Sequence, residues 1–127
     1  MLTGLYPITQ NVVSNGQRLD REVLTLPELL RADGYRTGAI VATAPLMATY
    51  GLSQGFQTYD DDFAESIVSR GVRSLLRLFS AARWNVSATR PAHRVAALAK
   101  TWLRRAARDG KPFFLWVHFI EPHDPYD

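Results

Sequence analysis

Histidine is the residue type in this chain best suited to acid–base chemistry, because its ordinary pKa lies close to neutral pH. The 127 residues include three histidines and no cysteine, which excludes a thiol nucleophile and a thiolate metal site within them. His123 stands out because Pro122 and Pro125 restrict the backbone on both sides of His123 and Asp124. The imidazole of His123 is therefore predicted to be a preorganised binding group.

A strand is expected to deliver His123 to a site. Residues 113–117, which follow Pro112, are all apolar and rich in Phe, Trp and Val, as is typical of a central strand covered on both faces. In open α/β sheets, ligands bind beyond the carboxyl ends of such strands. His123 lies just past this strand, and the rival interpretation is packing within a Pro-rich turn.

Other polar candidates have simpler explanations. His118 lies inside the apolar run, so a hydrogen-bonded core histidine is favoured over a ligand. His93 falls in the first turn of an expected helix and is predicted to be a surface residue. Asp60–Asp62 could suggest a metal cluster, but adjacent carboxylates point in different directions, which favours a solvated loop or helix start. The glycosylation sequon at Asn85 is common by chance.

The elements predicted around these residues alternate between helix and strand. Thr25 with Glu28 forms a capping-box pattern, and the helix that it starts ends at Gly34. Residues 36–43 follow directly, and Ile40 among small residues predicts a buried strand that meets another backbone closely. The order helix, glycine, strand is typical of an α/β domain.

The remaining segments complete the expected architecture. Residues 1–23 are predicted to form a short element followed by loop with little regular structure, and residues 44–62 a loop that Phe56 and Tyr59 pin to the core. Helical periodicity predicts an amphipathic helix over residues 63–83. A further helix begins at Pro91 and ends at residues 109–110. Its expected apolar face consists of Val95, Leu98, Ala99, Trp102, Leu103 and Ala106.

The expected fold class is therefore α/β, with a mixed, mainly parallel sheet flanked by helices. This chain would supply two strands and about three helices of it, so the core is expected to be incomplete.

Composition sets the broad class of the chain. The sequence is 46% hydrophobic and 21% charged, with a net charge of +3, and no apolar stretch reaches the length of a membrane span. Between Arg70 and Lys111 there are eleven Lys and Arg residues against one acid, Asp109. These cations have helical spacing and lack interleaved aromatic residues. We therefore expect solvated helix faces and no nucleic-acid partner.

Several short motifs, weak individually, occur in a specific order. Together they resemble sulfatases of the alkaline-phosphatase superfamily, from one end of the chain to the other. The segment Glu121-Pro-His-Asp-Pro-Tyr126 resembles the Asp-Pro-His-x-Pro-Tyr segment of that family. The other matching segments are Thr3-Gly-Leu-Tyr-Pro7, Asn15-Gly16, Thr25-Leu-Pro-Glu-Leu-Leu30, Gly34-Tyr-Arg-Thr37, Gly51-Leu-Ser-Gln-Gly-Phe56 and Tyr59-Asp-Asp61.

The resemblance implies a chemistry and a role for one residue. Sulfatases hydrolyse sulfate esters of small molecules or glycans with a formylglycine nucleophile, made within a Cys/Ser-x-Pro-x-Arg motif, and with a calcium ion. His123 matches the family histidine that binds the substrate sulfate and can assist protonation of the leaving group. The formylglycine motif would fall upstream of Met1, and the calcium ligands outside residues 1–127. The chain would then be part of a single catalytic domain and inactive alone.

The sequence also departs from the family pattern. Ala42 stands where many sulfatases have a sulfate-binding lysine, Ala44 where they have histidine, and Gln10-Asn11 replaces the usual His-Gly. One alternative is therefore a phosphoester hydrolase or phosphoethanolamine transferase of the same superfamily. Another is a non-catalytic module that binds anionic surfaces through its basic helices.

Overall fold

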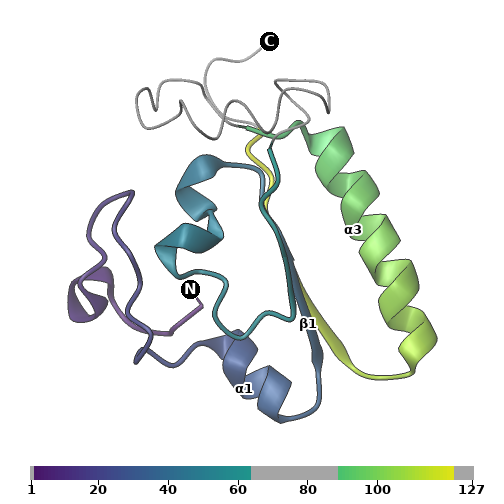
Figure 1. The fold of residues 1–127 in the computed structure, drawn as a ribbon, viewed down its shortest axis with the longest axis horizontal. Helices are drawn as coiled ribbons and strands as arrows, with labels where there is room; N and C mark the ends of the chain where they lie inside the picture. The colour runs from purple at the N-terminus through teal and green to yellow at the C-terminus, as the bar shows by residue number, and fades with distance from the viewer. Residues whose placement is uncertain (1, 64–88, 122–127) are drawn as a thin grey trace, which may run out of the picture.

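The computed structural model describes residues 2–63 and 89–121 of the chain (Figure 1). The helices and strands of these ranges are, in chain order, α1 (Leu26–Ala32), β1 (Arg36–Ile40), β2 (Thr58–Asp60), α3 (Ala92–Ala106) and β3 (Phe113–Val117). Short 3-10 helices occur at η1 (Pro7–Gln10), η2 (Ala44–Leu46), η3 (Ala48–Tyr50) and η5 (Ala107–Asp109).

The described strands form one parallel sheet in the order β2-β1-β3. Gly38 of β1 pairs with Thr58 on one side and with Leu115 on the other. Helices connect or precede the parallel strands, as parallel connections require, and this confirms the α/β class. Two details differ from the sequence-based expectation: β2 lies inside the segment predicted as loop, and β1, not β3, is the central strand of the described sheet.

The position of β3 explains why its residues are less buried than expected. On β3, Phe113 is exposed and the other four residues are only partly buried, whereas Thr37 to Ile40 of β1 are all buried. An apolar run identifies a strand, but it does not state how many neighbours that strand has.

The helix α1 forms where the capping pattern placed it. The Glu28 carboxylate accepts hydrogen bonds from the Thr25 backbone N–H at 2.8 Å and from the Thr25 hydroxyl at 2.7 Å. After the helix, Gly34 adopts φ 85°, a left-handed conformation that favours glycine and turns the chain directly into β1. The boundary between helix and strand is thus set by local sequence.

The helix α3 packs on one face of the sheet (Figure 1). Val95 and Ala99 join Ile40 and Ala42 in a buried apolar cluster. Leu103 was predicted to share this face, but it is 36% exposed. The expected close approach to β1 is made by a side chain, because the indole of Trp102 lies directly over Gly38.

Aromatic residues cover the opposite face of the sheet. Phe56 is buried and stacks on Phe114 and Trp116 of β3, with ring centroids 6.0 and 6.1 Å apart. The Tyr59 hydroxyl donates to the Leu46 carbonyl oxygen at 2.6 Å. These contacts confirm that Phe56 and Tyr59 attach residues 44–57 to the core. In Figure 1 this segment and α3 lie on opposite sides of the strands.

The amino-terminal segment has little regular structure, as predicted. Its one helix among residues 2–23 is η1, which has no buried residue. Leu19 is buried, and its N–H donates to the Tyr50 carbonyl oxygen at 2.9 Å.

Two sequence-based predictions lie outside the described residues. These are most of the amphipathic helix over residues 63–83 and the sequon at Asn85. In the part of the chain that the structure describes, none of the helices has the length and apolarity that crossing a bilayer demands.

Candidate functional site

The three parallel strands end at one edge of the sheet, which we call the carboxyl edge. It contains Ile40 of β1, Asp60 of β2 and Val117 of β3, which stand side by side in the pairing register. Ligand sites of open α/β sheets form at such an edge. His123 follows β3 by six residues but lies outside the described residues, so its position stays a prediction.

The segment that leads towards His123 is tied to two elements. The His118 N–H donates to the Ile40 carbonyl oxygen at 2.9 Å, which extends the pairing between β3 and β1. The Glu121 carboxylate accepts a hydrogen bond from the Ala92 N–H at 2.8 Å. A carboxylate at the amino terminus of α3 also interacts favourably with the helix dipole. The chain is thus anchored two residues before His123.

His118 differs from its sequence-based interpretation. It was predicted to be a hydrogen-bonded core histidine, yet its buried Nδ1 has no hydrogen-bond partner among the described residues. Burial lowers the pKa of the His118 imidazole below its ordinary value. A neutral imidazole is therefore favoured there, with one ring nitrogen unsatisfied.

At the end of β2, the structure shows an ion pair that the sequence analysis missed. Arg90 is 5% exposed, and its Nη2 donates to Asp60 Oδ1 and to the Asp62 carbonyl oxygen, both at 2.6 Å. The guanidinium also lies over the Phe63 ring, 5.5 Å from its centroid. Its Nη1 is buried without a hydrogen-bond partner among the described residues. Arg90 therefore holds unused N–H donors at the carboxyl edge.

Little in the sequence could have singled out Arg90. It is one of eleven Lys and Arg residues between residues 70 and 111, whose spacing predicts solvated helix faces. Its burial results from tertiary contacts, since its backbone N–H donates to the Ala42 carbonyl oxygen at 2.8 Å. The adjacent antiparallel bridge between Thr43 and Thr89 fixes the same approach.

The three adjacent aspartates do not form a metal site. Asp60 pairs with Arg90, whereas Asp61 Oδ2 accepts a hydrogen bond from the Ala48 N–H at 2.8 Å. Burial, and to a lesser extent the Asp61 carboxylate, raises the pKa of the Tyr59 phenol well above its ordinary value. Within residues 2–63 and 89–121, no group of three or more His, Asp or Glu side chains could hold a metal ion. The described residues therefore do not fit a calcium ion.

Ala42 occupies a position that the family pattern often fills with lysine. Its side chain is fully buried and packs in the cluster with Ile40 and Val95. A lysine there would bring an ammonium group into an apolar environment beneath α3, at a large desolvation cost. In this chain the position serves the core.

Comparison with known proteins gives one family. The family model described as "Sulfatase" matches residues 1–127, the full length of the chain. No curated protein matches the chain.

Proposed function

The chain belongs to the sulfatase family, and from this membership we propose that the protein hydrolyses sulfate esters at the carboxyl edge of its sheet. One observation carries the proposal: motifs in family order run the length of the chain and end with a His-x-Pro-Tyr segment just after β3. We propose that residues 1–127 are part of a single catalytic domain.

His123 is proposed to bind and protonate the substrate. An imidazole N–H can donate a hydrogen bond to a sulfate oxygen, which disperses the negative charge of that group. As the ester bond breaks, negative charge develops on the leaving oxygen, and a nearby imidazolium can supply a proton. His123 is thus proposed to act on both the sulfate and the leaving group.

Two described features support this role. Glu121 is held at the amino terminus of α3 by a hydrogen bond. The position of the chain two residues before His123 is therefore fixed. Arg90 has buried N–H donors without a partner among the described residues. Such donors are costly to leave unsatisfied, and a sulfate oxygen at this edge would satisfy them.

The nucleophile and the metal are proposed to come from residues outside this chain. Sulfatases use a formylglycine and a calcium ion, and the described aspartates do not fit such an ion. A metal, where bound, would stabilise negative charge on the sulfate oxygens. The contribution of this chain would be substrate binding and proton donation by His123.

The test compares the full-length protein, meaning the whole protein of which residues 1–127 are proposed to be part, with its His123→Ala variant. We expect turnover of phenyl sulfate, whose leaving oxygen is basic enough to need a proton, to fall by about 10²–10⁴-fold in the variant, because this is the usual value of general acid help. His93→Ala is a matched control, since His93 is exposed on α3, and it should leave turnover unchanged. Equal turnover of His123→Ala and the unmodified protein would contradict the assigned role.

The same assay separates the alternatives. A phosphoester hydrolase or phosphoethanolamine transferase would act on 4-nitrophenyl phosphate or on a phosphoethanolamine donor, and would leave the aryl sulfate intact. A non-catalytic module would act on neither, and would bind heparin or acidic vesicles with an affinity that falls steeply with salt.

A further inference from the structure

A polar cavity lies at the opposite, amino-terminal edge of the sheet. It has a volume of about 710 Å³ and is bordered by the end of α1, the start of β1, the residues around the start of β2, and the turn before β3. This volume is within the range of small-molecule sites. The side chains used below are Arg31, Arg36, Gln57, Thr58, Asp109 and Lys111.

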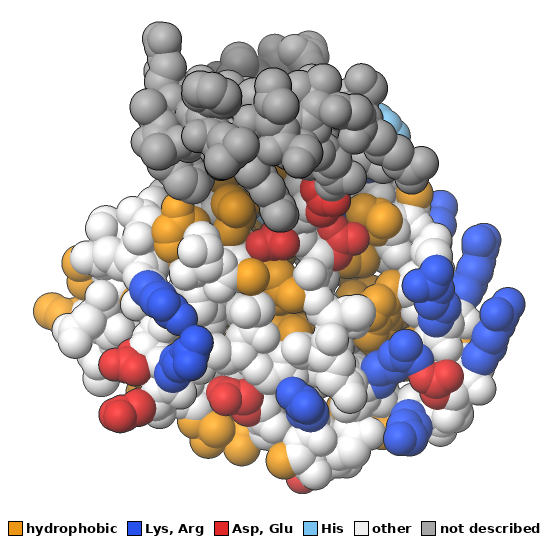
Figure 2. Space-filling model, in the orientation of Figure 1, with side chains coloured by type: hydrophobic (Ala, Val, Ile, Leu, Met, Phe, Trp, Pro, Cys, Tyr) orange, Lys and Arg blue, Asp and Glu red, His pale blue; other side chains and the backbone are white. Residues whose placement is uncertain are grey.

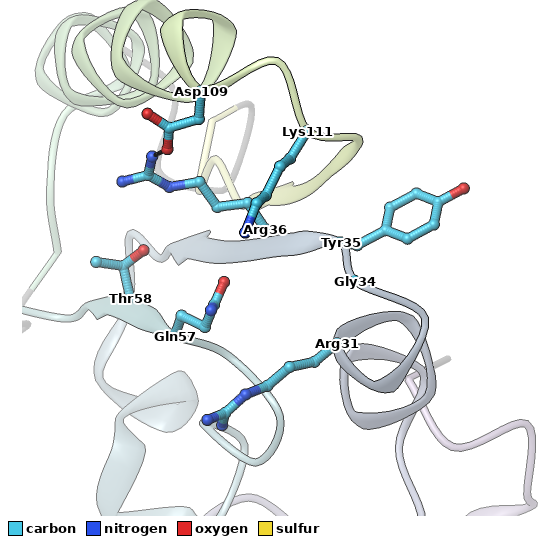
Figure 3. A pocket seen from close by; sticks show the side chains of 8 residues that line it. All are labelled: Arg31, Gly34, Tyr35, Arg36, Gln57, Thr58, Asp109 and Lys111. Atoms are coloured by element: carbon cyan, nitrogen blue, oxygen red, sulfur yellow. Dashed lines mark ion pairs between the residues drawn. The ribbon is translucent and has the colours of Figure 1, made fainter.

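The charge of the cavity is positive. Three cations and one carboxylate line it, which leaves a net charge of +2. Arg36 forms an ion pair with Asp109, and its guanidinium lies 5.8 Å from the centre of the Trp102 ring. Arg31 and Lys111 are exposed. Figure 3 shows Arg31 on the α1 side of the cavity, with Arg36 and Lys111 on the other side.

A neutral donor lies between these cations. The Gln57 Oε1 accepts a hydrogen bond from the Thr37 N–H at 3.0 Å, so the amide nitrogen of Gln57 remains as a donor. The neighbouring Thr58 hydroxyl is already engaged, because it accepts from Trp102 Nε1 at 2.8 Å. The cavity therefore presents one amide donor held by its bond to Thr37 and three cations, with one carboxylate among them.

We propose that this cavity binds a small anion with two phosphate or sulfate groups, one facing Arg31 and the other facing Lys111. Two cations on opposite walls, with an amide donor between them, match two separated anionic groups better than one. The site is distinct from the carboxyl edge, since it lies at the other ends of the same strands. Figure 2 shows that Lys and Arg side chains are also numerous on the α3 side of the molecule, which would attract anions.

The competing explanation is that these cations only stabilise the fold. Arg31 lies in the last turn of α1, where a cation interacts favourably with the helix dipole. That explanation accounts for Arg31, and the Gln57 amide is held because its oxygen satisfies the Thr37 N–H, but neither point accounts for Lys111, which follows η5. The dipole of α1 also opposes an anion, so the occupant must carry enough charge to overcome it.

The test measures binding to the full-length protein by isothermal titration calorimetry, with inorganic pyrophosphate and a disulfated disaccharide as probes. We expect Arg31→Ala and Lys111→Ala each to weaken binding of the preferred probe by about fivefold, the value of one partly screened charge. Lys100→Ala is the matched control, because Lys100 is exposed on α3 and does not line the cavity. It should change binding by less than about twofold.

Asp109→Asn provides a test in the opposite direction. It removes the one carboxylate of the cavity and releases Arg36, so we expect binding to become about fivefold tighter. The Arg36 and Asp109 side chains are 31% and 44% exposed, and an ion pair so exposed contributes little to folding. Melting temperatures without ligand would show that all variants remain folded.

The His123→Ala variant distinguishes binding at the cavity from binding at the carboxyl edge. It should leave probe binding at the cavity unchanged. The probes identify the anionic group: tighter binding of pyrophosphate assigns phosphate, and tighter binding of the disaccharide assigns sulfate. Two results would overturn the proposal. One is that neither probe binds, and the other is that binding is lost in His123→Ala but kept in Arg31→Ala and Lys111→Ala.

Discussion

At the scale of single residues, unsatisfied polar atoms distinguish the carboxyl edge. Arg90 Nη1 and His118 Nδ1 are buried without partners among the described residues. Such groups are rare in native structures because each loses its hydrogen bonds to water without replacement. His118 directly follows β3, and Arg90 binds Asp60 at the end of β2, so both lie where a ligand would be expected in an open α/β sheet.

His118 leads to a prediction about pH. Burial lowers its folded-state pKa below the unfolded value of 6.5, so below about pH 6.5 the unfolded state binds more protons. The free energy of unfolding should therefore decrease as the pH falls from about 6.5 to the folded-state pKa. His118→Leu removes this proton uptake, and in the full-length variant the loss of stability between about pH 7.5 and about pH 5.5 should be smaller.

Urea unfolding at the two pH values would measure the difference. His93→Ala is the control, because His93 is exposed and its removal should leave the pH dependence of the original protein intact. If His118→Leu and the unmodified protein lose the same stability on acidification, the imidazole is not held neutral by its environment.

At the scale of elements, Trp102 links α3 to the sheet. Its indole lies over Gly38, its Nε1 donates to Thr58 at 2.8 Å, and its ring meets Phe113 edge to face at 5.8 Å. One side chain therefore contacts all three described strands. The glycine at position 38 is needed for space, because a Cβ there would overlap the indole.

Gly38→Ala should consequently lower the free energy of unfolding by about 1–3 kcal/mol, the usual cost of overpacking. In a Trp102→Leu background the overlap is gone, and the same substitution should cost less than about 0.5 kcal/mol. Urea unfolding of the four proteins in this double-mutant cycle would measure the coupling. Equal costs in both backgrounds would show that the indole is not what requires glycine.

The elements also show which kinds of sequence signal are reliable. The capping pattern at Thr25 and Glu28, the glycine at position 34 and the periodicity of residues 92–106 predicted α1, the turn and α3, because each is decided by local contacts. The strand β2 has only three residues and depends on pairing with β1, so its local sequence reads as a loop. Sequence placed β3, but the number of its neighbours is a property of the whole sheet.

In the candidate site, too, some residues have a signal in the local sequence and others do not. His123 was singled out from the sequence by its flanking prolines and the preceding strand, and its role stays a prediction because it lies outside the described residues. Arg90 could not be predicted, because its burial depends on contacts with Asp60 and Ala42 that are distant in sequence. Ala42 reads as a missing lysine from the sequence alone, and the structure gives a reason in its packing beneath α3.

At the scale of the whole molecule, the two ends of the sheet have different chemistry. The carboxyl edge combines Asp60, Asp61 and Arg90 with the segment leading to His123, and the amino-terminal edge presents Arg31 and Lys111 around an open cavity. In Figure 2, one group of acidic side chains lies in the upper centre of the view, whereas below and to the right basic side chains lie interspersed with other acidic ones. An anionic substrate and a second anion could thus bind to one sheet without competing.

The last prediction concerns the proposal that this chain supplies His123 while other residues supply the nucleophile and the metal. If the nucleophile and the metal come from outside this chain, residues 1–127 expressed alone should not hydrolyse 4-nitrophenyl sulfate, whereas the full-length protein should. A general acid alone contributes about 10²–10⁴-fold, whereas enzymes accelerate reactions by about 10⁶-fold or more. Release of nitrophenol would be measured for both proteins at equal concentration, with circular dichroism to establish that residues 1–127 are folded. Turnover by the folded chain alone, abolished in its His123→Ala variant, would mean that these residues contain a complete catalytic site and that the proposed external nucleophile is wrong.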